Sequence, residues 1–429
     1  VKDIDETYAE SAAVLNGLGV FKGYEEKDGT FSFQPKNAIT RAEVAAIVYR
    51  IYTQDVKDTY VKNYETYNKF GDMAGAGWAK GYIGYCANAA LVKGYPDGNF
   101  KPSGNVTGYE VLAMILRAVG YDQKNEFTGA DWALHVAEIA ERQGILDNVK
   151  GVDLNAPATR EVVAELLFQA IQVPMVTYTA AFGYQNVSLN EKADNKIFAK
   201  NKTLGDAFNL ASYKGYITYN AKKEAMVLTE KGEKTADDVI VTVADQDVFD
   251  AGRYGHVWAT KTTAITDVFY DDALLSTSYA GTAIATLTTK KTGNSDYVAD
   301  LAKKNMVVYN GNETVDPTIV KGTEVAMYSI DGKTISSIIV VNPTVDYMEA
   351  DYVVKGDEVK IQGVKYDKDE VSGYEDLVKG DVFTFVDMAD AVRYYEELAP
   401  INGQKTKYTI PTKDLSLIHI SEPTRLALI

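Results

Sequence analysis

The chain is poor in residues on which many folds and active sites depend. Its 429 residues include one cysteine and three histidines, so an internal disulfide and a histidine-rich metal cluster are both excluded. Cys86 lies in an alanine-rich helical stretch, which favours a small buried hydrophobe over a reactive thiol. No stretch reaches the roughly 20 apolar residues that a membrane-spanning helix needs. Positive charge is scarce too, and a net charge of −16 argues against nucleic acid as a partner.

Signatures of catalysis are equally scarce. The sequence has no nucleophile elbow and no phosphate-binding loop, and in the C-terminal half His256 is the one histidine that could take part in a reaction. It lies beside Val257 and Trp258 in a strand pattern, where a packed or surface role is commoner. Carboxylate pairs such as Asp271-Asp272 point to opposite faces if they lie on a strand. We therefore expect no enzyme and no catalytic residues.

A motif that occurs three times within the first 173 residues is the most informative feature present. It reads Ile39-Thr40-Arg41-Ala42-Glu43, then Val106-Thr107-Gly108-Tyr109-Glu110, then Ala158-Thr159-Arg160-Glu161-Val162. Similar landmarks precede each motif, and the second copy, which is the most complete, has Phe70-Gly71-Asp72, Trp78-Ala79, Gly94-Tyr95 and Pro102. An internal repeat of this kind constrains the fold before any other pattern does.

Each copy predicts two helices separated by a turn rich in Gly, Asp and Pro. Gly19, Gly94 and Gly144 are placed to end the first helix of the three copies. A helix-loop-helix unit is too small to bury a core alone, so we expect three units in an α-rich, pseudo-threefold bundle with the second helices at its centre. The expected boundaries are 1–52, 70–121 and 122–173, with an exposed insertion rich in Tyr and Lys at 53–69.

The Thr-x-x-Glu spacing has a local explanation. A threonine at a helix N-terminus accepts a bond from the amide three residues on, and a glutamate at that position bonds back. This predicts capping boxes at Thr40 with Glu43 and at Thr107 with Glu110. Thr159 is expected to cap a third helix, but the third copy has no glutamate at the right position, so its box is broken.

Capping does not explain Arg41, because a cation at a helix N-terminus opposes the helix dipole. An arginine there becomes reasonable if an anion also binds, since free amides and the guanidinium then converge on one carboxylate or phosphate. The three copies resemble the S-layer homology (SLH) domain, three of which commonly stand in tandem at one end of bacterial surface proteins. In that family the arginine of the motif helps to bind an acidic secondary cell-wall polysaccharide, which often carries pyruvate ketals, in grooves between repeats.

Carried over by position, the resemblance implies six polysaccharide contacts: Arg41, Arg160, Asp3, Asp72, Trp78 and Trp132. For the two tryptophans, packing beneath the repeat is an equal alternative. The second copy has Gly108 in place of the arginine, so we expect two competent pockets out of three. Because the whole chain is acidic, attraction of an acidic polymer must come from local arginine pockets.

From about residue 174 the composition changes. Short runs rich in Val, Ile, Thr and Tyr follow, and they predict β-strands with tight turns. Examples are 216–219, 239–243, 306–309, 338–341 and 382–385, with hairpin signals at Asn310-Gly311 and Asp331-Gly332. Residues 320–328 and 378–385 form a fainter repeat, and 203–210 predict one short helix. We expect all-β modules, small antiparallel barrels or sandwiches, at 174–245, 246–345 and 346–414.

Calcium is the one cofactor to consider, because Asp28-Gly29 and Asp97-Gly98 are acidic turns. Neither has the spaced Asp/Asn ladder of a calcium loop, so a simple glycine turn is preferred and we expect no cofactor or metal. Leu415 to Arg425 resembles translated transposase-type sequencing adapter, so we expect residues 415–429 to be an artefact and the natural C-terminus to be missing. The chain starts without Met inside the first copy, so a secretion signal is expected upstream.

These features together predict a secreted, non-enzymatic surface protein. Residues 1–173 are expected to anchor it non-covalently to wall polysaccharide, and the β modules to form or project from a self-associating surface lattice. Two alternatives stay open. One is an anchored enzyme whose catalytic module followed Asp414, and the other is an adhesin whose β modules bind host glycan or protein.

Overall fold

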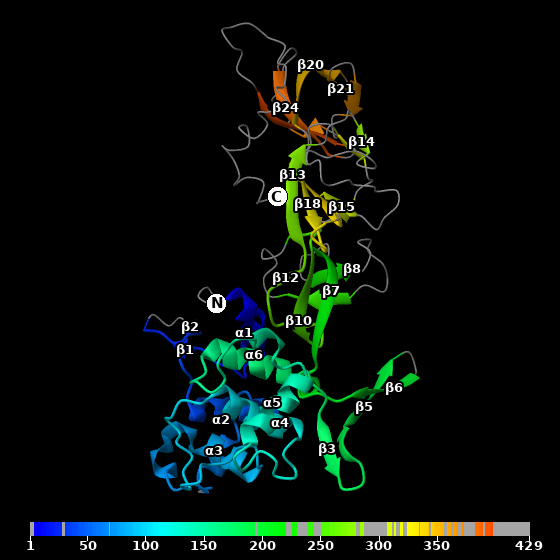
Figure 1. The fold of residues 1–429 in the computed structure, drawn as a ribbon. Helices are drawn as coiled ribbons and strands as arrows, with labels where there is room; N and C mark the ends of the chain where they lie inside the picture. The colour runs from blue at the N-terminus through cyan, green and yellow to red at the C-terminus, as the bar shows by residue number, and fades with distance from the viewer. Residues whose placement is uncertain are drawn as a thin grey trace. The chain divides into compact units, whose positions relative to one another are not determined.

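A computed structural model describes residues 4–27, 31–67, 69–193, 196–219, 225–229, 239–243, 250–279, 284–286, 307–310, 313–314, 318–320, 324–333, 335–342, 345–355, 358–361, 364–367, 371–372, 382–388 and 391–397. The chain divides into two compact units (Figure 1). The first consists of Val1–Tyr213 with Val257–Phe269, and the second of Lys214–His256 with Tyr270–Ile429. This division does not follow the change of composition at residue 174.

The first unit contains three successive pairs of α-helices. They are α1 (Glu6–Gly17), α2 (Arg41–Thr53), α3 (Lys80–Asn88), α4 (Gly108–Val119), α5 (Trp132–Arg142) and α6 (Arg160–Ala170). Short 3-10 helices lie between and after them: η1 (Val61–Tyr64), η2 (Met73–Ala79), η3 (Asp147–Val149) and η4 (Gly205–Phe208). The last of these falls within 203–210, where the sequence predicts a short helix.

The helix pairs interlock in a ring. The first helix of each pair packs chiefly on the second helix of the preceding pair: α3 on α2, α5 on α4, and α1 on α6. Antiparallel bridges join the residues before the second helices, Ala38 to Thr159, Thr40 to Asn105 and Thr107 to Pro157. Because every pair contributes to two junctions, no pair buries its apolar face alone.

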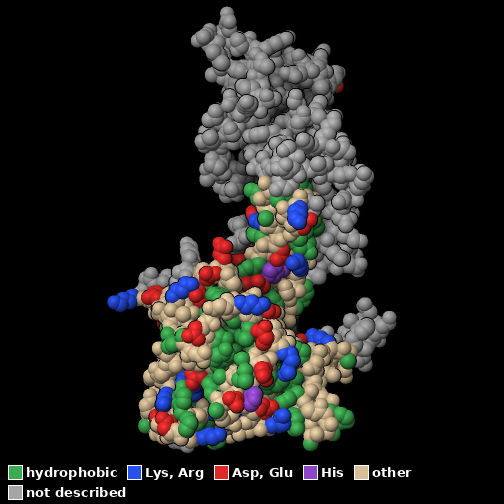
Figure 2. All heavy atoms as spheres, in the orientation of Figure 1, with side chains coloured by type: hydrophobic (Ala, Val, Ile, Leu, Met, Phe, Trp, Pro, Cys, Tyr) green, Lys and Arg blue, Asp and Glu red, His purple; other side chains and the backbone are tan. Residues whose placement is uncertain are grey.

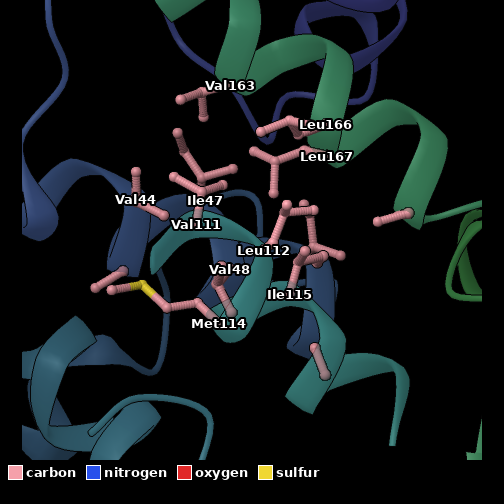
Figure 3. Packing of buried hydrophobic residues seen from close by; sticks show 14 of the residues in the cluster. Val44, Ile47, Val48, Val111, Leu112, Met114, Ile115, Val163, Leu166 and Leu167 are labelled. Carbon is pink, nitrogen blue, oxygen red and sulfur yellow. The ribbon is translucent and has the colours of Figure 1, made fainter. Parts of the chain in front are cut away.

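The second helices α2, α4 and α6 share the core of this unit (Figure 3). They contribute residues at helical spacing: Val44, Ile47 and Val48 from α2, Val111, Leu112, Met114 and Ile115 from α4, and Val163, Leu166 and Leu167 from α6. Each of these residues has at most 3% of its surface exposed. Apolar residues three and four apart form one face of a helix, which is why the three faces can meet.

Glycine ends two of the three first helices, as predicted. Gly19 and Gly144 follow α1 and α5 with φ of +74° and +73°. The prediction for Gly94 is wrong, because α3 ends six residues earlier at Asn88 and Ala90 takes the left-handed conformation at φ +58°. Gly94 serves close packing instead, since a Cβ there would lie 2.7 Å from both the Asn99 carbonyl oxygen and the Phe70 ring.

The insertion at 53–69 packs against α3 on one side. Several of its side chains are exposed, as predicted. Its helix η1 lies against α3, where a Cβ on Gly81 would be 2.2 Å from the Val61 carbonyl oxygen. A Cβ on Gly84 would be 2.2 Å from the Tyr64 carbonyl oxygen. Residues three apart share one face of a helix, so these two glycines admit the backbone of the insertion to within contact distance.

The first unit also carries short hairpins. These pair β1 (Tyr24–Glu25) with β2 (Phe31–Ser32), β3 (Val176–Thr179) with β4 (Gly183–Asn186), and β5 (Ser188–Ala193) with β6 (Lys196–Asn201). The strands that follow along the chain are β7 (Leu210–Tyr219), β8 (Ala225–Thr229), β9 (Val239–Thr242), β10 (Tyr254–Thr260), β11 (Thr263–Ala264), β12 (Phe269–Tyr270), β13 (Ala273–Tyr279) and β14 (Ile284–Thr286). They continue with β15 (Val307–Asn310), β16 (Glu313–Thr314), β17 (Thr318–Val320), β18 (Glu324–Ser329), β19 (Ser337–Asn342), β20 (Val345–Lys355), β21 (Glu358–Ile361), β22 (Val364–Asp367), β23 (Val371–Ser372), β24 (Val382–Met388) and β25 (Ala391–Glu397).

The strand predictions agree with this β-rich region. The described residues of the five example segments fall in or beside β7, β9, β15, β19 and β24. The hairpin signal Asp331-Gly332 lies between β18 and β19, and at the other signal Asn310 ends β15, which pairs with β16, while Gly311 lies outside the described residues. Strand order is β13-β18-β19-β15-β16 in one sheet and β22-β21-β20-β24-β25-β23 in another. These sheets are mixed and not purely antiparallel, because β15 pairs with β19 and β23 with β25 in parallel after intervening strands reverse the chain.

Candidate functional site

Arg41, the first residue of α2, is buried, with 3% of its surface exposed. Its guanidinium reaches into the second copy of the motif, where Nε donates to the Phe100 carbonyl at 2.8 Å and Nη2 to the Lys93 carbonyl at 3.1 Å. Nη1 donates to Glu110 Oε1 at 3.0 Å. The rings of Tyr95 and Phe100 lie 4.5 and 4.6 Å from the guanidinium carbon, within the range of cation–π attraction.

Glu110 supplies the anion that makes an arginine acceptable at the N-terminus of a helix. Its Oε2 accepts a bond from the Thr107 amide at 2.9 Å and so caps α4, while its Oε1 accepts from Arg41 and, at 2.5 Å, from the Tyr95 hydroxyl. Burial and the bond to Glu110 raise the pKa of Tyr95 to about 12, so the hydroxyl stays protonated and donates. The Glu110 carboxylate therefore caps α4 and also neutralises Arg41, which belongs to another copy of the motif.

A groove with a volume of about 420 Å³ opens beside this cluster. It runs between α4, the loop Lys93 to Pro96 and the start of α5. Its lining includes charged and aromatic side chains, namely Arg41, Lys93, Tyr95, Glu110, Arg117, Phe127 and Trp132. A volume of this size suits one or two sugar rings or another small ligand.

The groove carries an excess of positive charge. Lys93 Nζ and Arg117 Nε each lie 2.7 Å from Asp122 Oδ2, so three cations, Arg41 included, face the two carboxylates of Asp122 and Glu110. Burial lowers the pKa of Arg117, but the bonds to Asp122 oppose that effect. On the face of the helical unit drawn in Figure 2, acidic and basic side chains are interspersed. A local excess of cations is therefore what could attract an anion to this acidic chain.

Arg160 repeats the arrangement of Arg41 one junction away. Its Nε donates to the Phe33 carbonyl at 2.7 Å, its Nη2 to the Lys22 carbonyl at 3.0 Å and its Nη1 to the Tyr24 hydroxyl at 3.1 Å. Nη1 also lies 3.6 Å from Glu43 Oε1. With 2% exposure, Arg160 first of all holds the third copy against the first.

The remaining junction has no such clamp. Gly108 stands at the position of Arg41 and Arg160, and the Tyr109 amide donates to the Leu154 carbonyl at 3.2 Å. A Cβ on Gly108 would lie 2.6 Å from Leu154 Cδ2 and 3.2 Å from its Cα. The Leu154 side chain therefore closes this junction and leaves no room for an arginine.

The other predicted site residues are spread around the unit. Asp72 accepts bonds from the amides of Phe100 and Lys101 at 2.9 and 2.7 Å, so it holds the loop that contacts Arg41. Trp132 is half-buried and lines the groove. Trp78 is 63% exposed and meets Tyr82 edge-on at 5.7 Å, away from the groove. Asp3 lies outside the described residues.

Four of the charged and aromatic groove residues were not predicted as site residues: Lys93, Tyr95, Arg117 and Phe127. For Arg117 a signal exists, because it follows Glu110 by seven residues on a helix and so shares its face. Lys93 and Tyr95 flank a glycine in a loop whose path the helix pattern does not fix. That these residues bind a polysaccharide stays a prediction.

The predicted capping boxes form at α2 and α4. Thr40 and Thr107 each accept a bond at 3.3 Å from the amide of the glutamate three residues on, and each glutamate bonds back. Thr159 occupies the N-cap of α6, but its hydroxyl oxygen is buried with no hydrogen-bond partner. Its prediction as a capping side chain is wrong: Val162 has the amide that a threonine cap needs, but it lacks the carboxylate that in α2 accepts a bond from the Thr40 hydroxyl at 2.7 Å and so orients it.

Among the described residues, no group of three His, Cys, Asp or Glu side chains is arranged to hold a metal ion. Asp97 accepts a bond from the Asn99 amide at 3.0 Å and pairs with Lys101 at 3.2 Å, while Asp28 and Gly29 lie outside the described residues. Within the described part of the chain, no helix is both long and apolar enough to cross a membrane.

In the second unit, the neighbours Asp271 and Asp272 lie between β12 and β13 and have different partners. Asp271 Oδ2 lies 2.9 Å from His256 Nδ1 and 3.0 Å from Lys214 Nζ. Asp272 Oδ1 accepts from Arg253 Nη2 at 2.8 Å. The two carboxylates therefore do not act as a pair.

Comparison with known proteins agrees with the repeated motif. The family model of the S-layer homology domain matches residues 2–45 and 69–112. Each matched segment contains one first helix, α1 or α3, and ends just beyond the Thr-x-x-Glu capping box that opens the next helix.

Relatives with different names share a segment of similar length. The middle cell wall protein of Brevibacillus brevis is 27% identical over 173 residues, which are 40% of this chain and 15% of that protein. The cellulosome-anchoring protein of Acetivibrio thermocellus is 31% identical over 175 residues, 39% of this chain and 36% of that protein. An amylopullulanase of Thermoanaerobacterium thermosulfurigenes is 29% identical over 188 residues, 40% of this chain and 9% of the enzyme.

The chain thus spans well under two thirds of the length of these relatives. Each of these relatives matches about 40% of this chain, over 173 to 188 residues, although their names describe different proteins. Residues 2–45 and 69–112 match the S-layer homology domain, and the chain is similar over about 40% of its length to a cell wall protein and to a cellulosome-anchoring protein.

Proposed function

We propose that the chain holds itself non-covalently to an acidic secondary cell-wall polysaccharide through the groove beside Arg41, and that it catalyses no reaction. The observation that carries this proposal is the groove itself, where three cations and the rings of Tyr95 and Trp132 surround one cavity. The relatives support it, because a cell wall protein, an anchoring protein and an enzyme have in common a segment suited to attachment.

The geometry divides the roles among the groove residues. Arg41 already donates to two carbonyls and one carboxylate, so its main role is to hold two copies together and to set the shape of the groove. Lys93, with a third of its side chain exposed, is the cation that a sugar carboxylate or pyruvate ketal can reach. Trp132 offers a ring against which the apolar face of a sugar can pack.

One groove gives weak binding by itself. A charge-assisted bond contributes roughly 1.5–3 kcal/mol, so firm attachment needs several sites acting together. We propose that residues 122–173 are a third, diverged SLH repeat, which the bridges to the first two copies and the equivalent contacts of Arg160 support. We propose further that the β-rich region builds a surface lattice by self-association.

An anchored enzyme is the second candidate function, and the amylopullulanase relative is the observation in its favour. Incubation of the chain with pullulan and starch, followed by a reducing-sugar assay, decides between the two. Release of sugar above a heat-inactivated control would sink the non-enzymatic proposal.

Co-sedimentation of the full chain with peptidoglycan sacculi tests the anchoring role. Sacculi stripped of secondary polysaccharide should no longer pull the chain down. The variants Lys93→Ala and Trp132→Ala should weaken sedimentation, and Lys150→Ala should not, because Lys150 is an exposed lysine outside the groove, paired with Asp147. Equal sedimentation with intact and stripped sacculi would overturn the proposal, as would equal losses in all three variants.

A further inference from the structure

A second pocket lies in the first unit, between the insertion and helices α2 and α3. Its volume is about 340 Å³, and its lining includes four tyrosines and two polar side chains: Tyr49, Tyr60, Tyr64, Tyr85, Gln54 and Asp55. It shares no lining residue with the groove beside Arg41. The size is at the lower end of the range for small-ligand sites, about 300–1,000 Å³.

The pocket exists because the insertion can approach α3 closely. Gly81 and Gly84 leave room for the backbone of η1, whose carbonyl oxygens would lie 2.2 Å from a Cβ at either position. This approach brings Tyr64 against Tyr85, with ring centroids 4.9 Å apart and ring planes at 87°. Tyr85 in turn meets Tyr49 at 5.1 Å and 88°. Edge-to-face contacts of this kind fix the rings in place.

Asp55 fixes the polar side of the pocket. Its Oδ2 accepts bonds from the Tyr49 hydroxyl at 2.6 Å and the Tyr60 amide at 2.9 Å, and its Oδ1 accepts from the Thr59 amide at 2.8 Å. Burial alone would raise the pKa of Asp55, but these bonds outweigh burial and hold the pKa below its ordinary value. The carboxylate is therefore ionised at neutral pH, and its charge is used to order the loop that carries Tyr60.

The chemistry of the lining selects against charged ligands. Among the described residues that line the pocket there is no Lys, Arg or His, so an acidic sugar suited to the groove finds no countercharge here. Asp55 already accepts three hydrogen bonds, which compensate its negative charge, so a cationic ligand is disfavoured. Ring faces and tyrosine hydroxyls remain, together with the side-chain oxygen of Gln54, whose amide nitrogen already donates to the Ile51 and Tyr52 carbonyls at 3.2 and 2.7 Å.

We propose that this pocket, formed by the insertion against α2 and α3, binds an uncharged pyranose sugar. The apolar face of the sugar packs against the tyrosine rings, and its hydroxyls bond to the tyrosine hydroxyls and donate to the side-chain oxygen of Gln54. The proposal does not depend on the groove or on its acidic ligand. If both sites act, the chain reads two different sugars of one wall, and their effects on attachment combine.

Isothermal titration calorimetry of the full chain tests this inference. The probes are two uncharged trisaccharides, cellotriose and N,N′,N″-triacetylchitotriose, with trigalacturonic acid as a charged comparison. At least one uncharged trisaccharide should bind, and Tyr60→Ala should weaken that binding by about tenfold. Tyr60 is 62% exposed, so its removal takes little packing from the fold.

Two variants serve as matched controls. Tyr67→Ala removes another exposed tyrosine of the same insertion, 39% exposed and outside the pocket lining, and should leave the affinity unchanged. Lys93→Ala alters the groove and should also bind the trisaccharide normally. Failure of the wild-type chain to bind either uncharged trisaccharide overturns the inference. Equal losses in Tyr60→Ala and Tyr67→Ala, or a loss in Lys93→Ala, overturn it as well.

Discussion

Replacement of Glu110 by alanine should destabilise the helical unit more than any other change to a capping residue. The bond from the Tyr95 hydroxyl to Oε1 is lost, and two larger losses accompany it. The first is the bond from the Thr107 amide to Oε2, and the second is the contact of Arg41 with Oε1, at 3.0 Å. The side chain of Arg41 is 4% exposed and that of Glu110 14%, so water cannot replace the lost carboxylate freely.

The magnitude follows from these two losses. A capping interaction is worth about 1 kcal/mol, and removal of one partner from a buried ion pair costs about 3–5 kcal/mol. Arg41 keeps its bonds to the Phe100 and Lys93 carbonyls, so we expect a total near the lower figure, about 3 kcal/mol. Glu43→Ala should cost less, because Arg160 lies 3.6 Å from Glu43 and the carboxylate there is 20% exposed.

Urea unfolding followed by far-ultraviolet circular dichroism measures both variants, since the long helices belong to the first unit. The double variant Arg41→Met with Glu110→Ala provides the decisive comparison, because it removes the charge that Glu110→Ala leaves unpaired. It should be less destabilised than the sum of its parts. A loss of less than about 1 kcal/mol for Glu110→Ala would show that only the cap was lost, and the role given to the Arg41 contact would be refuted.

Three further expectations concern single side chains. Thr107→Val should cost about 1 kcal/mol by removing a capping bond, whereas Thr159→Val should be neutral or stabilising because the buried Thr159 hydroxyl has no partner; parallel urea titrations measure both, and equal costs would contradict the assignment. Burial raises the pKa of the fully buried Cys86 thiol far above its ordinary value, so a thiol reagent should modify it only in denaturant, and equal rates with and without urea would refute this. Burial alone would raise the pKa of Asp122, but its bonds from Lys93, the Phe127 amide and Arg117 outweigh burial and lower it. Its stabilising effect should therefore be complete above the unfolded-state pKa, about pH 4, and be lost as the pH falls through the lower folded value; Asp122→Asn should remove that part of the pH dependence of unfolding.

Features whose partners lie within one helical turn could be predicted from the sequence. The boxes at Thr40 and Thr107 formed as expected, because each needs only a glutamate three residues away. The role of Arg41 was not predictable in the same way, since its carboxylate partner is 69 residues further along the chain. The cation at this helix N-terminus does have an anion beside it, and that anion is the second oxygen of Glu110, from another copy of the motif.

The insertion shows a signal that was present in the sequence and not used. Gly81 and Gly84 are three residues apart in a helix, a spacing that lets another backbone approach one face. A backbone that approaches this face of α3 would bring the tyrosines of the insertion against the helix. Helix-ending rules could not have predicted the role of Gly94. A glycine is needed there because the loop packs closely on Phe70, and not because a helix ends.

The three junctions of the ring also explain two departures from the repeat that look independent in the sequence. In the intact junctions, the arginine of one copy meets the capping glutamate of another, Arg41 with Glu110 and Arg160 with Glu43. In the third junction the arginine would come from the second copy and the glutamate from the third. Those are the positions of Gly108 and Val162, so the cation and the anion are absent from the same junction.

A paired absence is what the energetics of buried charges favour. Either charge left alone in a buried junction costs several kcal/mol, about 3–5 by comparison with other buried pairs, whereas replacement of both by apolar groups is close to neutral. Leu154 fills the junction instead, against Gly108. Gly108→Arg alone should therefore destabilise the unit strongly, both by collision with Leu154 and by an unpaired charge. Addition of Val162→Glu and Leu154→Ala should recover part of that loss, and failure of the triple variant to recover any stability in urea unfolding would contradict the equivalence of the three junctions.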